Sequence, residues 1–248
     1  MRKFIFLTAV FLFLFFVPGV KKDSASTNGV ILKDFSSITF FINQKQIDNY
    51  HLLEHIVVLP EDSFNQTEAI NMIQRINLIH PSLLQQLISE NITIKLFNGN
   101  LTDEPSAAHL RGITPRGYSS ERTTWDEVPG VGGGKTVLAK IGHSENGDGH
   151  GSLNLELHEL AHSIDRHVLN LIREDTIFKK IWKEEASQVF PNREYFITYP
   201  EEYFAETFVM YYFSENTRNE LKEKAPMTYE LFRHIEQSSY DVNVSTYR

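Results

Sequence analysis

The sequence predicts an α+β fold: a small N-terminal lobe of mixed strands and helices, a helical C-terminal lobe, and a cleft between them. Two observations support this fold class. Short β-branched or alternating segments occur only as far as residue 141, whereas almost every segment after residue 152 has apolar residues at helical spacing. Strands mixed with helices, followed by helices alone, are typical of α+β proteins.

The N-terminal lobe is expected to contain two strands with helices between them. Residues 55–59 (HIVVL) and 92–97 (ITIKLF) are short and rich in β-branched residues, as strands are. The intervening helix is indicated by apolar residues at i, i+3, i+4 and i+7, namely Ala69, Met72, Ile73 and Ile76. Asn65 and Glu68 have capping-box spacing at its start, and His80-Pro81 is expected to end it. A second helix follows through Leu83, Leu84, Leu87 and Ile88.

The segment VPGVGGGKT, residues 128–136, ends like a phosphate-binding loop. Such a loop needs a glycine where this chain has Pro129, which has no N–H and a fixed φ. It also leads into a helix, whereas residues 136–141 alternate as a strand does. We therefore interpret glycines 130–134 as a flexible turn that enters a strand.

The C-terminal lobe is predicted to be helical throughout, with helices over residues 153–169, 175–189, 200–213, 215–224 and 228–237.

The N-terminus has the layout of a secretory signal peptide. Two basic residues precede an apolar run from Phe4 to Val17, and small and polar residues follow. This run is shorter than the ~20 residues that a membrane anchor needs. We expect residues 1–25 to be the signal peptide, residues 26–50 an N-terminal extension, and residues 51–248 one domain of a secreted protein.

Composition narrows the classes of partner. The chain has a formal net charge of −8, which disfavours nucleic acid as a ligand. It contains no cysteine, so the folded domain is stabilised without disulfides. We expect a monomer that has no membrane association after signal cleavage.

The sequence LNLELHELAHSIDRHV contains the pattern His158-Glu159-Leu160-Ala161-His162. Histidines four residues apart lie about 40° apart on one helix face, so both rings can bind one metal ion. Glu159 projects to one side of that ion, where a base can take a proton from water. The alternative, two core histidines satisfied by hydrogen bonds, is disfavoured because the apolar stripe lies on the opposite face, at Leu153, Leu157, Leu160, Ala161, Ile164 and Val168. His143, His150 and His167 lack such spacing and are interpreted as surface or turn residues.

A catalytic zinc site needs three protein ligands and one open position. The third ligand is expected in YFITYPEEYFAETFVMYYF, where Glu202 and Glu206 lie one helical turn apart. The residues alone do not decide between these two glutamates. Glu201 and Glu202 are also explained as acidic residues that complement a helix N-terminus.

Three segments together, WDEVPGVGG, LNLELHELAHSID and YPEEYFAETF, resemble the catalytic domain of anthrax toxin lethal factor and its small secreted relatives, the Pro-Pro endopeptidases. The likeness runs from about residue 50 to the C-terminus. It implies a zincin-like fold that binds one Zn²⁺ per chain through His158, His162 and Glu202. It further implies that Glu159 is the general base.

The same resemblance implies roles for residues around the metal. Tyr195, seven residues before Glu202, would donate a hydrogen bond to the developing oxyanion. Glu201 and Glu206 would orient the ligands.

For the substrate, the resemblance implies a proline-containing protein chain. The loop of Gly132, Gly133 and Gly134 would border the cleft beside an edge strand at 136–141 that can pair with an extended peptide. Trp125 and Tyr118 would contact proline rings. Tyr118 stands where members of this family carry Trp, so the residues preferred around the cut are expected to differ.

These features predict a secreted zinc-dependent endopeptidase that cleaves between two prolines. Two alternatives remain: a lethal-factor-like toxin protease with a host protein target, and a zinc-stabilised binding module without turnover. The presence of both Glu159 and Tyr195 disfavours the binding module, because binding alone requires neither.

Overall fold

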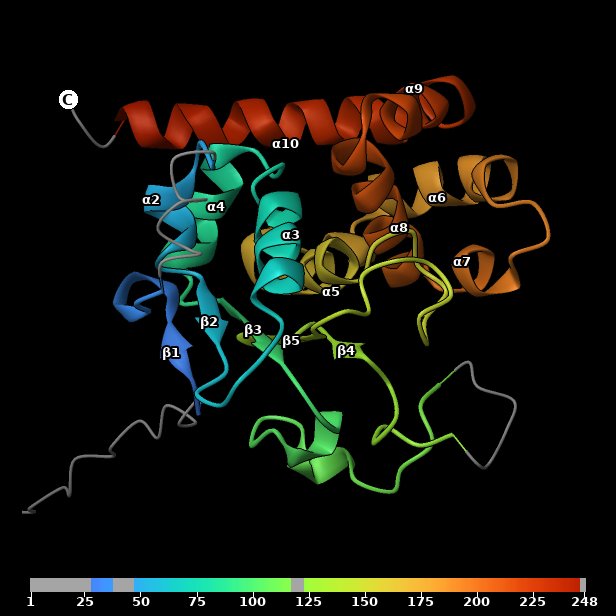
Figure 1. Ribbon diagram of the computed structural model, residues 1–248. Helices are drawn as coiled ribbons and strands as arrows, with labels where there is room; N and C mark the ends of the chain where they lie inside the picture. The colour runs from blue at the N-terminus through green and yellow to red at the C-terminus, as the bar shows by residue number, and fades with distance from the viewer. Residues whose placement is uncertain (1–27, 38–46, 117–122, 246–248) are drawn as a thin grey trace, which may run out of the picture.

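A mixed five-stranded sheet crosses the N-terminal lobe of the computed structural model, which describes residues 28–37, 47–116 and 123–245 (Figure 1). The order of the strands in this part of the chain is β1-β2-β3-β5-β4. Their bounds are β1 Val30–Ile31, β2 Val57–Leu59, β3 Thr93–Phe97, β4 Gly130–Val131 and β5 Thr136–Lys140. The predicted signal peptide and Tyr118 lie outside the described residues.

The central strands β2, β3 and β5 are parallel, and the two-residue strands β1 and β4 pair antiparallel at the edges. The prediction of an edge strand at 136–141 is therefore wrong. Gly130 pairs with Ala139 and Val131 with Leu138, so β4 covers that side of β5. The first two residues of the expected glycine turn are strand, and β4 is the edge of the sheet.

Helices α2 (Tyr50–Leu53), α3 (Gln66–Ile76) and α4 (Pro81–Ser89) complete the N-terminal lobe. Asn65 caps α3 as expected, because its side chain accepts the Glu68 N–H at 3.2 Å. His80-Pro81 does not end α3, which stops at Ile76. Instead His80 caps the start of α4 and Pro81 occupies its first turn, where the missing N–H is not needed.

The C-terminal lobe is helical, as predicted, but α5 and α10 differ from their expected bounds, and α7 was not predicted. Helix α5 covers only Leu155–Ser163, and residues Ile164–Val168 continue as a π-helical turn, η4. Helix α10 is longer than expected and runs from Pro226 to Ser245. The other helices are α6 Thr176–Val189, α7 Glu194–Thr198, α8 Pro200–Phe213 and α9 Glu215–Lys224. Short 3-10 turns are η1 Leu32–Asp34, η2 Leu101–Asp103, η3 Ala108–Leu110 and η5 Ile172–Glu174.

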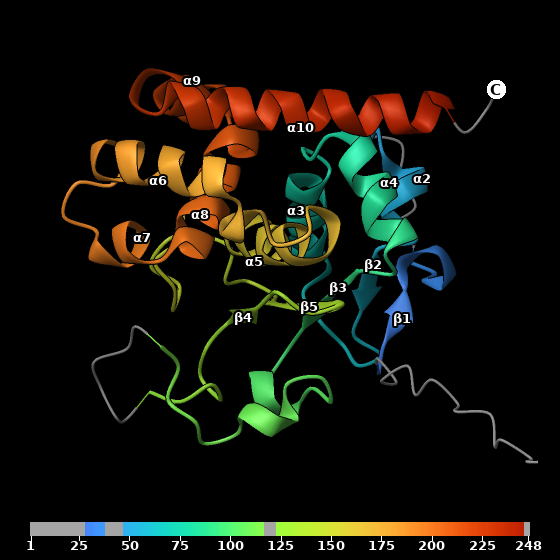
Figure 2. The ribbon, with the colours of Figure 1, turned by 180° about the vertical axis from the view of Figure 1, so that it is seen from behind.

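The helices cover one face of the sheet, and residues 98–116, which follow β3, lie on the other face (Figures 1 and 2). Alternation along β3 matches these two layers: Ile94 and Leu96 join the main core, whereas Phe97 joins a smaller cluster on the other side. In both views α10 lies across the helices of the two lobes and contacts α4, α6, α8 and α9.

The site depends on the packing of α5 against α8. Asn154 begins α5 by accepting the Leu157 N–H at 3.1 Å, and Pro200 begins α8. Almost the whole of α8 is buried, from Glu202 to Tyr212. Its buried polar residues therefore face other protein groups, where a lone charge would be costly. In the described residues, no helix is long and apolar enough to cross a membrane.

Candidate active site

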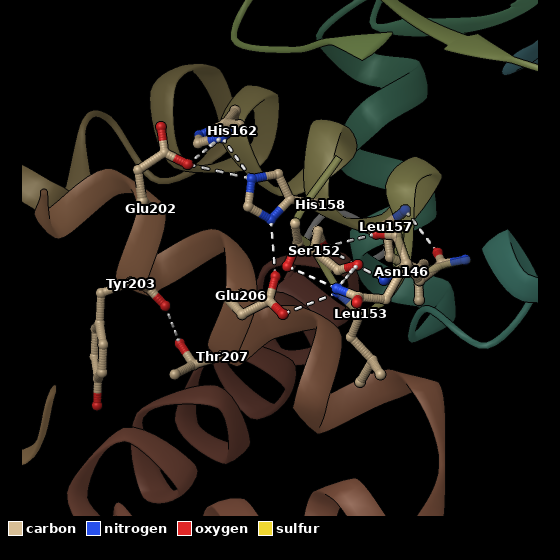
Figure 3. A network of polar contacts seen from close by, with 12 residues as sticks. Asn146, Ser152, Leu153, Leu157, His158, His162, Glu202, Tyr203, Glu206 and Thr207 are labelled. Atoms are coloured by element: carbon tan, nitrogen blue, oxygen red, sulfur yellow. Dashed lines mark hydrogen bonds and ion pairs between the residues drawn. The ribbon is translucent and has the colours of Figure 1, made fainter. Parts of the chain in front are cut away.

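Helices α5 and α8 bring His158, His162 and Glu202 together at their interface (Figure 3). The two histidine Nε2 atoms lie 3.2 Å apart. Oε2 of Glu202 lies 3.3 Å from Nε2 of His158 and 3.5 Å from Nε2 of His162. The predicted histidine pair thus faces a carboxylate from the second predicted helix, and the three atoms form a nearly equilateral triangle.

This triangle fits a metal ion. Ligand atoms about 2.0–2.1 Å from a tetrahedral zinc ion lie about 3.3–3.4 Å from one another, close to the three separations seen here. Nδ1 of His158 lies 3.2 Å from Oε2 of Glu206, and a carboxylate can only accept, so Nδ1 carries hydrogen. Nε2 of a neutral His158 ring then points its lone pair at the centre of the triangle. The donor set of two imidazoles and one carboxylate could hold a metal ion.

Glu206 holds His158 in this orientation. Its Oε1 accepts the Leu153 N–H at 2.9 Å, while Oε2 faces Nδ1 of His158 (Figure 3). Leu153 lies just before α5, so the Glu206 carboxylate links the start of α5 to Nδ1 of His158, the ring nitrogen that faces away from the triangle. Glu202 and Glu206, one turn apart on α8, therefore contact the two nitrogens of the same ring.

The second oxygen of Glu202 is held by two donors. The Tyr195 hydroxyl donates to Oε1 at 2.9 Å, and the Arg116 guanidinium lies 3.1 Å from the same atom. Arg116 also forms an ion pair with Glu201 at 2.8 Å and stacks on the Tyr199 ring at 4.0 Å. Oε2 is thereby left free to face the histidines. Arg116 had no part in the sequence prediction, because no spacing rule connects it to a residue 86 positions later.

The electrostatics favour a positive charge inside the triangle. Burial by itself lowers the pKa of His158, but hydrogen bonds to Glu202 and Glu206 outweigh burial and raise the pKa to about 10. Burial raises the pKa of Glu202, yet its bonds with His158 and His162 hold it well below its usual range. A cation at this point is therefore stabilised by two nearby carboxylates.

Glu159 is partly buried and lines the same cleft as His158, His162 and Glu202. Burial raises the pKa of its carboxyl group, which makes it a stronger base than an exposed glutamate. The glycine loop lies directly on this residue. A Cβ atom on Gly132 would lie 2.0 Å from the backbone oxygen of Glu159, and one on Gly130 would lie 3.0 Å from its Cγ.

A cleft of about 880 Å³ opens over these groups. Of the residues predicted to border the substrate, Trp125, Gly132 and Gly133 line its wall, and Gly134 is not among the lining residues. Edge strand β4 lines the same wall. Unpredicted side chains in the lining include His150, Glu194 and four arginines, Arg116, Arg166, Arg173 and Arg193.

His150, interpreted from the sequence as a surface or turn residue, lies in a bend, is partly buried and lines the cleft. Its Nε2 lies 2.9 Å from the His143 carbonyl oxygen. Arg193 ties the same segment to α7, since it donates to the Gly151 carbonyl and stacks on the Phe196 ring at 4.3 Å. Neither contact lies within one helix, so helical periodicity could not indicate them.

The family described as anthrax toxin lethal factor, N- and C-terminal domain, matches residues 42–235 of this sequence. The chain belongs to this family. The resemblance inferred from the three sequence segments is therefore confirmed. The matched region includes His158, His162 and Glu202.

Curated relatives within the lethal factor family are Pro-Pro endopeptidases. That of Paenibacillus alvei is 45% identical over 184 residues, which are 74% of this chain and 84% of the relative. That of Clostridioides difficile is 42% identical over 187 residues, 75% of this chain and 84% of the relative. The solved structure of the Paenibacillus alvei enzyme superposes with a TM-score of 0.71 at 43% identity, covering 74% of this chain and 99% of that one. The predicted α+β fold is confirmed, and the chain is a metalloprotease homologue.

Proposed function

We propose that this chain is a secreted zinc endopeptidase that cleaves peptide bonds between two prolines. The triangle of His158, His162 and Glu202 at the base of the cleft carries the proposal. Two histidines and one carboxylate with an open position are typical of catalytic zinc. The N-terminal sequence pattern supports secretion, and the 45% identity to a Pro-Pro endopeptidase supports the choice of bond.

Glu159 is the residue that we assign as general base. Zinc, when bound, polarises the substrate carbonyl and lowers the pKa of water to about 7. The Glu159 carboxylate stands beside the ligand triangle and takes the proton of the attacking water. Because burial raises its pKa, the group then holds the proton long enough to pass it to the leaving nitrogen.

We assign Tyr195 as the hydrogen-bond donor to the oxyanion. Burial, together with the nearby Glu202 carboxylate, raises the pKa of this hydroxyl, so it keeps its proton at neutral pH. It lies 2.9 Å from Oε1 of Glu202 and therefore beside the place where a bound carbonyl reacts. To donate to the oxyanion, the hydroxyl exchanges this partner, while Arg116 continues to hold Oε1.

Selection of proline rests on shape, because proline has no N–H to pair with a strand. The wall formed by β4 and the glycine loop carries no large side chain next to Glu159, which lets a kinked peptide approach the backbone closely. Trp125 provides an aromatic face in the same cleft, on which a proline ring can pack.

The proposed specificity is tested with four matched peptides whose central pair is Pro-Pro, Ala-Pro, Pro-Ala or Ala-Ala. We expect cleavage of the first alone within the time of the assay, read by mass spectrometry, with the cut between the prolines. Cleavage of all four peptides would retain the protease and remove the Pro-Pro assignment. Failure to cut any of them, with zinc bound, would contradict the proposed function for this class of substrate.

The proposed role of Glu206 predicts weaker metal binding in Glu206→Gln. The glutamine amide offers one acceptor to two donors, Leu153 N–H and His158 Nδ1–H, so its NH₂ group must face one of them. We expect zinc affinity to fall about 10- to 100-fold in a competition with a chelator. Glu201→Gln is the control, because Glu201 pairs with Arg116 and touches neither histidine. Equal affinity losses in the two variants would argue against this role for Glu206.

A further inference from the structure

Ser163 follows the metal-binding residue His162 and is fully buried. Its Oγ accepts the Gly133 N–H at 3.0 Å and donates to the Gly134 carbonyl oxygen at 2.9 Å. Both bonds of this hydroxyl therefore lead from the metal-binding helix α5 to the glycine loop. A buried hydroxyl with donor and acceptor both satisfied holds its partners more firmly than an exposed one does.

The π-helical turn η4 adds two further contacts to the same loop. Nε2 of His167 lies 3.2 Å from the Gly133 carbonyl oxygen, and the Arg166 guanidinium lies 3.4 Å from it. The wider turn of a π-helix changes the direction of the side chains that follow α5. Gly133 has φ of +80°, a conformation that side-chain-bearing residues rarely adopt. The backbone of the glycine loop is thus held at Gly133 and Gly134 by residues that directly follow His162 in the chain.

The anchored loop packs closely against the backbone of Glu159. Gly132 lies so close to the backbone of Glu159 that a Cβ atom would lie 2.0 Å from its oxygen and 2.8 Å from its carbonyl carbon. One side of Glu159 is therefore in contact with a loop whose position depends on Ser163.

We propose that Ser163 is a positioning residue for peptide hydrolysis. Its hydroxyl holds Gly133 and Gly134, which keeps Gly132 packed against the backbone of Glu159 and so fixes the direction in which the carboxyl group faces the attacking water. The proposal rests on the role of Glu159 as base. In this proposal the glycine loop has two roles. It leaves room for the substrate at the wall of the cleft, and, held by Ser163, it also fixes the position of the base Glu159.

Ser163→Ala tests this with steady-state kinetics on the zinc-loaded full chain and the Pro-Pro peptide. A misplaced base lowers kcat, whereas a displaced wall that only borders the substrate raises KM. We expect kcat to fall about 10- to 100-fold, with KM changed by less than about threefold. A rise in KM at unchanged kcat would overturn the proposal, and so would unchanged kinetics.

Thr207→Val is the matched control. Thr207 is also a fully buried hydroxyl on a central helix, but it donates to the carbonyls of Tyr203 and Phe204 in its own helix. We expect it to lower the unfolding temperature about as much as Ser163→Ala does, with little change in kcat. A loss of kcat in the control equal to that in Ser163→Ala would assign the effect to general destabilisation and overturn the positioning role.

Hydrogen exchange provides a readout that does not depend on activity. In Ser163→Ala the Gly133 amide loses its acceptor, so its exchange is expected to be at least about tenfold faster, whereas amides in α8 keep their rates. Unchanged exchange at Gly133 would remove the physical basis of the proposal. If the wild-type chain cut no peptide at all, the proposed function would fail, while this exchange result would still show whether Ser163 holds the loop.

Discussion

Glu159→Gln is expected to lower kcat for the Pro-Pro peptide by about 10²- to 10⁴-fold while the chain keeps one zinc ion. Glutamine has the shape of glutamate but cannot take a proton from water. Glu159 does not belong to the triangle formed by His158, His162 and Glu202, so metal binding has no reason to change. Activity is measured on the purified full chain, and bound zinc is measured by elemental analysis of the same sample.

Glu194→Gln is the control for this variant. Glu194 also lines the cleft, but it is exposed and lies outside the metal centre, so the same chemical change there is expected to leave kcat nearly unaltered. Loss of zinc from Glu159→Gln would make Glu159 a metal ligand and not a base. Full activity with zinc retained would require another residue to accept the proton.

Helices and strands could be predicted from the sequence where the residues of one short segment determine the type of element. The apolar spacing in α3 and the alternation in β5 each identify the element, and Asn65 marks the start of α3. The end of α5 could not be predicted, because Ile164 and Val168 fit helical spacing although the backbone there is a π-helical turn. Periodicity shows which face of a helix is apolar. It does not show which carbonyl accepts each backbone N–H, and this pairing is what distinguishes a π-helix from an α-helix.

The neighbours of a strand are harder to predict than the strand itself. Residues 136–140 form a strand as predicted, but the residue pattern of a strand does not show which strands lie on either side of it. Their partner β4 has only two residues, one of them Gly130, so it has no sequence signal of its own. The sequence therefore predicts β5 as the edge strand, whereas β4 forms the edge in the structure.

The candidate site divides in the same way. His158, Glu159 and His162 lie on one helix, so their spacing indicates their convergence. The choice between Glu202 and Glu206 depends on the angle between α8 and α5, which no local pattern contains. In the structure the two glutamates face opposite nitrogens of His158, at Nε2 and Nδ1. Arg116 is a tertiary contact across 86 positions and has no local signal at all.

Gly132→Ala is expected to lower kcat/KM by about 100-fold or more. Its Cβ atom would lie 2.0 Å from the Glu159 backbone oxygen, whereas real Cβ contacts are essentially never shorter than 3.0 Å. The loop or α5 must therefore move by about 1 Å, and a shift of that size at a reacting group costs about 10²-fold in rate. The contact is with backbone on both sides, so no side-chain rotation can relieve it. Activity is measured on zinc-loaded protein, with its unfolding temperature recorded in parallel.

Gly134→Ala is the matched control, two positions away in the same loop. A Cβ atom there would meet nothing nearer than the Thr136 backbone oxygen at 3.4 Å, an ordinary contact, and the residue does not have the positive φ that restricts Gly133. We expect kcat/KM within a few-fold of wild type and unchanged or slightly higher stability, since alanine reduces the freedom of the unfolded chain. If both variants lost activity equally, the loop would need flexibility at every glycine. If Gly132→Ala alone retained activity, the loop could not be seated on Glu159. A loss confined to Gly132→Ala would show that this glycine is required for its close contact with the helix that carries the base.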